Sequence, residues 1–92
     1  MAIAENLFEK DKDAKLDYTA DWTAWLGADD ISIATWVVPT GITKVSDSNN
    51  TKIAVIWLEG GTIGVIYEVI CRIATTAGRI DDRTLLFKIV EK

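Results

Sequence analysis

The 92-residue chain contains no histidine, one cysteine and one proline, and each scarcity excludes a class of protein. Without histidine, the most frequent general base and a common metal ligand are both missing. A single cysteine excludes an intrachain disulfide and a cysteine-rich zinc site. Basic residues are also few: ten Lys and Arg stand against fourteen Asp and Glu, which leaves a net charge of −4. We therefore expect no nucleic-acid partner, because phosphate contacts require clustered cations.

Long hydrophobic runs are absent as well. The apolar stretch at residues 53–58 is far shorter than the roughly 20 residues that cross a bilayer, so no membrane partner is expected. Residues 1–6 lack the basic and apolar regions of a secretory signal, which predicts synthesis in a reducing cytoplasm. In that compartment Cys71, within the apolar run 69–73, is interpreted as a small core residue.

What the chain has in quantity is strand-forming residues. Ile, Val and Thr together number 29, and apolar residues alternate with polar ones from residue 16 onward. Gly, Pro, Asn and Asp clusters interrupt this pattern every 10–15 residues, and no segment keeps a helical period. The pattern predicts strands at residues 16–22, 31–38, 42–45, 51–58, 63–75 and 83–90.

This spacing indicates one all-β domain: an immunoglobulin-like sandwich of about six to seven antiparallel strands. Tyr67 follows the glycine-rich corner at residues 60–64, as in a tyrosine corner, where the hydroxyl bonds to upstream backbone. The inward positions on the last two strands would then be Tyr67, Val69, Cys71 and Ile73, and Leu85, Phe87 and Ile89.

Residues 1–15 differ from the rest, because charges of both signs surround a single apolar pair, Leu7 and Phe8. We predict a flexible N-terminal arm at residues 1–15, outside a sandwich formed by residues 16–92. The arm is either a frayed terminus or a segment that docks on a neighbour through Leu7 and Phe8; the sequence leaves both open.

The central strands are apolar in both phases, whereas a solvated sandwich would be polar on its outer phase. Two-sided apolar strands predict either cover by the N-terminal arm or a contact surface for another chain, and we favour the contact surface. The residues predicted to form it are Leu7, Phe8, Ile56, Ile66, Ile70 and Leu86. Structural roles in the core are predicted for Trp36, Trp57 and Tyr67.

No motif for catalysis, cofactor or metal is present. Asp11, Asp13 and Asp17 have the spacing of a calcium loop only in part, because its central glycine and terminal glutamate are missing. The serines lack a histidine that could activate them. The alternative to a structural role is a carbohydrate-binding or host-adhesion module, in which Trp22 and Trp25 would stack on sugar rings.

Several segments together resemble the bacteriophage fibre–tail adaptor proteins. The most specific is Leu-Asp-Tyr-x-x-Asp-Trp-x-x-Trp-Leu at residues 16–26. Further matching segments follow in order at residues 30–31, 35–39, 57–64, 75–79 and 81–85.

The resemblance implies an immunoglobulin-like virion protein that joins larger proteins in the tail or neck. Its partners would be tail tube, neck or fibre proteins, with several copies in each particle. The family offers no catalytic residues, which agrees with the absence of an enzyme motif in this chain.

Overall fold

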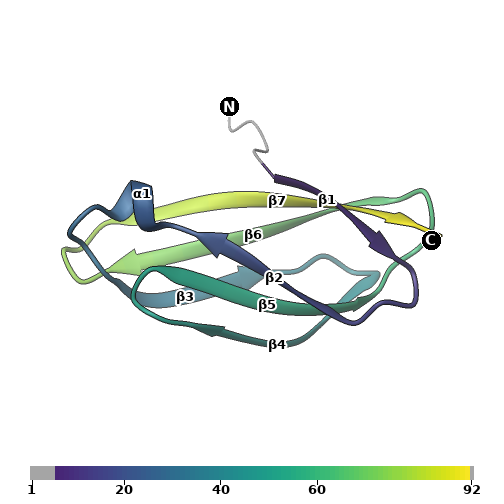
Figure 1. Cartoon of the computed structure of the whole chain (residues 1–92), viewed down its shortest axis with the longest axis horizontal. Helices are drawn as coiled ribbons and strands as arrows, with labels where there is room; N and C mark the ends of the chain where they lie inside the picture. The colour runs from purple at the N-terminus through teal and green to yellow at the C-terminus, as the bar shows by residue number, and fades with distance from the viewer. Residues whose placement is uncertain (1–5, 92) are drawn as a thin grey trace.

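The computed structural model describes residues 6–91 as seven strands and one short helix (Figure 1). In chain order these are β1 (Asn6–Asp11), β2 (Leu16–Asp21), α1 (Thr23–Leu26), β3 (Ile31–Val37), β4 (Ile42–Asn49), β5 (Ile53–Gly60), β6 (Ile66–Thr75) and β7 (Ile80–Val90). The strands lie along the 41 Å axis of the molecule, so the turns gather at its two ends (Figure 1).

The strands form two sheets that pack face to face. The first sheet has the order β1-β7-β6-β3 and the second sheet has the order β2-β5-β4. All neighbouring strands are antiparallel except β1 and β7, which are parallel. The predicted all-β sandwich is therefore confirmed.

The inward phase of the two longest strands is the one that the alternation predicted. Every second side chain is buried against the second sheet from Tyr67 onward in β6 and from Leu85 onward in β7, because a strand turns successive side chains to opposite faces. This buried set comprises Tyr67, Val69, Cys71, Ile73, Leu85, Phe87 and Ile89. Trp36 is also buried, on β3, as predicted.

The predicted arm is wrong for residues 6–11, which form the edge strand β1. The Phe8 ring stacks on Phe87, with centroids 5.2 Å apart, and meets the edge of Tyr18 at 5.4 Å. Two alternating inward positions, Phe8 and Lys10, were hidden by the charges around them. Residues 1–5 of the predicted arm lie outside the described residues.

The predicted phase of β5 is wrong. Ile56, expected on the surface, is fully buried, and Trp57, expected in the core, is 39% exposed. The run Ile-Ala-Val-Ile-Trp-Leu at residues 53–58 is apolar in both phases, so alternation alone could not say which set faces inward.

Two predicted loops belong to strands. Residues 46–49, expected in a turn, continue the edge strand β4 past a register shift between Lys44 and Ser46. Asp81 and Asp82, expected in a loop, pair with Ile73 and Arg72 within the sheet. At an exposed position, polar residues with weak strand preference are tolerated because the ladder partner supplies the backbone bonds.

The end of the sandwich around the β5–β6 connection is fixed by buried groups. We call it the glycine end, comprising Lys10, Gly41, residues 60–64 and Tyr67. The Tyr67 hydroxyl accepts a hydrogen bond from the backbone N–H of Thr62 at 3.0 Å, the contact expected of a tyrosine corner. The Lys10 ammonium donates to the Gly60 carbonyl at 2.8 Å, and desolvation lowers the pKa of Lys10.

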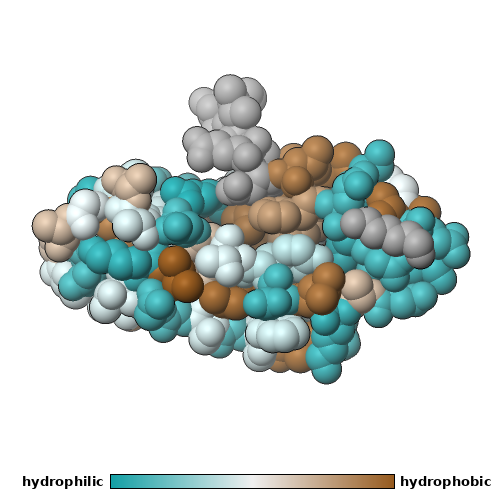
Figure 2. Space-filling view, viewed as in Figure 1, coloured by the Kyte–Doolittle hydropathy of each residue, from teal (hydrophilic) through white to brown (hydrophobic). Residues whose placement is uncertain are grey.

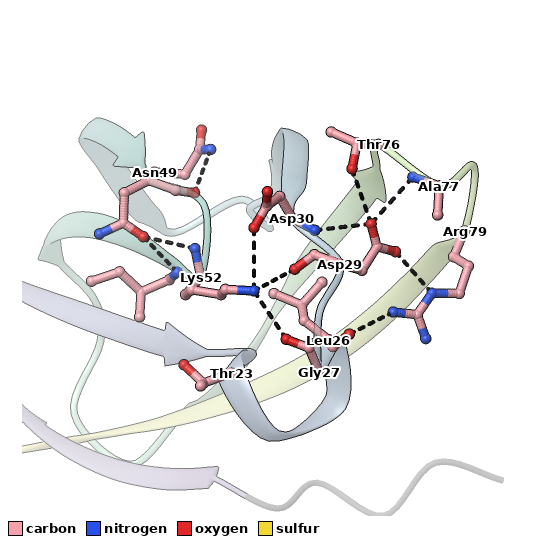
Figure 3. Close-up of polar contacts among 12 residues, drawn as sticks. Thr23, Leu26, Gly27, Asp29, Asp30, Asn49, Lys52, Thr76, Ala77 and Arg79 are labelled. Carbon is pink, nitrogen blue, oxygen red and sulfur yellow. Dashed lines mark hydrogen bonds and ion pairs between the residues drawn. The ribbon is translucent and has the colours of Figure 1, made fainter.

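The opposite end, around α1, is fixed by a polar network near the surface (Figure 3). We call it the helix end. The Asp29 carboxylate accepts hydrogen bonds from Thr76, Ala77 and Arg79 of the β6–β7 turn. Lys52 donates to the carbonyls of Gly27 and Asp29. Three turns that are distant in sequence are thereby tied together.

Candidate functional site

The outer side of the first sheet carries a group of exposed apolar side chains. Leu7 on β1 is 63% exposed and lies in register with Leu86 on β7. Ile70 on β6 is half-buried, in register with exposed Val37 on β3. The set, called here the apolar face, comprises Leu7, Ile33, Val37, Ile66, Ile70 and Leu86.

Charged groups lie between and beside these side chains. Lys88 is the register partner of Ile66, and Glu68 is that of Leu86. Arg72 and Asp82 form a two-pronged ion pair, with nitrogen–oxygen distances of 2.7 and 3.0 Å. Bonding to Arg72 lowers the pKa of Asp82 below its ordinary value. The face thus combines apolar contact area with polar groups that can fix orientation, as in protein interfaces.

Figure 2 shows part of this arrangement from the side. Brown and tan residues gather at the upper centre of the view, where β1 and β7 lie in Figure 1. Below them, over β2 and β5, pale and teal residues alternate with brown ones. In this view, the region over β1 and β7 is therefore more continuously apolar than the region over β2 and β5.

The structure unites four of the six predicted contact residues on the apolar face: Leu7, Ile66, Ile70 and Leu86. The other two do not lie there. Ile56 points into the core and cannot contact a partner, and Phe8 is half-buried between the sheets. Val37 and Ile33 were not among the residues predicted for the contact surface. Both occupy the phase of β3 opposite to the inward residue Trp36, and this alternation could have identified them.

The predicted sugar-stacking pair is wrong, because Trp22 is only 1% exposed. The short helix α1 turns the chain after β2 and places the Trp25 ring against Trp22, with centroids 5.4 Å apart. The Arg79 guanidinium covers the Trp25 ring at 4.2 Å. These two indoles support the helix end and offer no open platform.

Catalytic and metal chemistry find no support in residues 6–91. Cys71 is fully buried, and desolvation raises the pKa of its thiol to about 11, so it is not a reactive thiolate at neutral pH. Within the same residues no cluster of acidic or cysteine side chains has the geometry to hold a metal ion. Nor does any helix in this range have the length and apolar character to cross a membrane.

A protein-family model described as "Podophage GP4 fiber-tail adaptor protein gp77" matches residues 10–88. The chain belongs to this family. The match runs from the end of β1 into β7, and it confirms the resemblance seen at residues 16–26 and beyond. Family membership indicates a structural phage protein that binds other tail or fibre proteins.

Among solved structures, the chain is similar to one described as "Solution structure of the PKD domain from KIAA 1837 protein". The TM-score is 0.63, and the match covers 98% of this chain and 85% of that one. At 15% identity the likeness concerns the fold alone, which is that of an immunoglobulin-like domain. No curated protein is significantly similar in sequence.

Proposed function

We propose that this adaptor joins larger proteins of the phage tail, in the neck or at the fibre attachment, through the apolar face of its first sheet. The observation that carries the proposal is the set of apolar side chains that the register brings together on the outer side of β1, β7, β6 and β3. Exposed apolar groups collected on one face are typical of a surface that another protein covers.

The contact would derive its free energy from removal of these side chains from water, at roughly 25 cal/mol for each Å² before association costs. Lys88, Glu68 and the Arg72–Asp82 pair would set the orientation of the partner, because charges at an interface contribute more to specificity than to affinity. The proposal includes several copies in each particle and synthesis in the host cytoplasm before assembly.

The variant Ile66→Asp tests this contact. The new carboxylate would lie opposite Lys88 on β7, so the folded sheet gains an opposite-charge pair, while a covering partner would have to bury an acid. We expect wild-type thermal unfolding and about a 30-fold weaker contact, measured as loss of the protein from purified virions by quantitative mass spectrometry.

Ile70→Asp, at the centre of the same face, should behave alike. Thr40→Asp adds the same charge in the exposed β3–β4 turn and serves as the matched control, with normal incorporation expected. A normal complement of both Ile66→Asp and Ile70→Asp in virions would reject the apolar face as the contact.

A further inference from the structure

The outer side of the second sheet differs from the apolar face in having one exposed aromatic ring among polar groups. Trp57 projects from the middle of β5, the central strand, and is 39% exposed. Its register partners are Asp17 on β2 and Ser46 on β4, one on each side. The adjacent row contains Thr19, Val55 and Ser48.

Within residues 6–91, the side chains of Asp17 and Ser46 make no hydrogen bond or ion pair, which leaves the polar groups beside Trp57 available to a ligand. The outward positions of β2, β4 and β5 also carry Asp21 and Glu59 but no Lys or Arg. Lys44 of β4 lies in register with buried Leu58 and therefore points the other way.

This chemistry disfavours a covering protein surface. Interface centres are depleted of charge, and burial of the Asp17 carboxylate under an apolar partner would leave it without bonds. A ligand with both an apolar face and several hydroxyl donors could cover the Trp57 ring and, at the same time, donate hydrogen bonds to the Asp17 carboxylate. A sugar ring has this character, since its axial C–H groups form an apolar side and its hydroxyls lie around the rim.

We propose that Trp57, Asp17 and Ser46 form a binding site for a neutral hexopyranose unit of a glycan. The ring stacks on the indole, and its rim hydroxyls bond the Asp17 carboxylate on one side and the Ser46 hydroxyl on the other. Register partners on neighbouring strands have Cβ atoms about 5 Å apart, so Asp17 and Ser46 lie beside Trp57, within reach of groups on the edge of a stacked ring.

The charges of this face select among sugars. Carboxylates accept hydrogen bonds from neutral hydroxyls, whereas they repel the carboxylate of a sialic or uronic acid. The site is also independent of the proposed protein contact, because the two lie on opposite sheets. An adaptor that is held in a particle through its first sheet could therefore still present Trp57 to a surface glycan.

The test is a titration of the ¹⁵N-labelled full chain with methyl β-D-glucopyranoside, methyl β-D-galactopyranoside and N-acetyl-D-glucosamine, followed by NMR. We expect at least one of the three to bind with Kd on the order of 1 mM and to shift the Trp57 indole N–H and the amides of Asp17 and Ser46. Sialyllactose should produce shifts at least tenfold weaker.

Trp57→Ala should abolish these shifts, and Asp17→Asn should weaken binding about tenfold. Ile80→Ala, which removes an exposed apolar side chain from β7 of the other sheet, is the matched control and should leave the shifts unchanged. Absence of shifts with all three neutral sugars, or shifts that survive in Trp57→Ala, would overturn the proposal. Loss of virion incorporation in Trp57→Ala without any sugar binding would also overturn it, in favour of a second protein contact.

Discussion

The two ends of the sandwich are closed by different physical means. At the helix end, Asp29, Lys52 and Arg79 bind backbone and side chains of three turns near the surface, where water can replace a lost bond. At the glycine end, Tyr67 and Lys10 are buried, and Gly61 lies against the core residue Ile89. Hydrogen bonds of similar length therefore contribute unequally to the free energy of unfolding, because a buried group that loses its partner cannot bond to water instead.

The largest effect is expected for Gly61→Ala at the glycine end. Gly61 has φ +105°, and a Cβ there would lie 2.6 Å from Cγ1 of Ile89. Backbone strain and overpacking together should lower the free energy of unfolding by about 3 kcal/mol. Urea unfolding followed by tryptophan fluorescence measures the change.

Gly60→Ala separates these two causes. Gly60 also has a positive φ, +80°, but a Cβ there would meet no atom within 4 Å among the described residues. Gly60→Ala should therefore lower the free energy of unfolding by only about 1–2 kcal/mol, the cost of the backbone conformation. Equal decreases in the free energy of unfolding for the two variants would show that the Ile89 side chain moves aside at little cost and that the core at this end is not tightly packed.

A pair of single hydrogen-bond deletions compares the ends directly. Tyr67→Phe removes the acceptor of the Thr62 N–H at the glycine end and should cost about 1 kcal/mol, or about 5 °C in Tm. Thr76→Ala removes one donor to Asp29 at the exposed helix end and should cost about 0.5 kcal/mol or less. Calorimetry measures both, and a larger loss for Thr76→Ala would reverse the proposed ranking of the ends.

The smallest effect is a pH dependence at the helix end. Hydrogen bonds from Thr75 and then from Asp30, Arg79 and Thr76 lower the pKa of Asp29 well below its ordinary value of 3.8. A lowered pKa in the folded state means that Asp29 stabilises the fold above pH 3.8 and that this contribution is lost as the pH falls toward the folded-state pKa. Asp29→Asn should therefore flatten the decline of Tm in acid, and an unchanged decline would assign acid sensitivity to other carboxylates.

Alternation along the sequence predicted most of the fold where only one phase was apolar. In β6, Glu68 and Arg72 mark the outer side, so the inward set of Val69, Cys71 and Ile73 could be identified. In β5 both phases are apolar, and the choice between Ile56 and Trp57 depends on which side the other sheet covers. That information lies in long-range pairing and not in the local pattern.

The remaining misses have the same origin. The parallel pairing of β1 with β7 joins segments almost eighty residues apart, and the local sequence around Phe8 and Lys10 does not predict it. The short helix α1 interrupts the period after β2, and this bend brings Trp22 and Trp25 together. The candidate contact was predictable in outline because Ile66, Ile70 and Leu86 lie on strands whose pattern was clear.

The parallel alignment of β1 and β7 has a mechanical consequence. Six register pairs, from Asn6–Leu85 to Asp11–Val90, join the first and last strands. When tension pulls the N-terminal side of β1 and the C-terminal end of β7 apart, the two strands slide against each other. Every rung of the ladder then resists at the same moment instead of opening one by one as in a zipper.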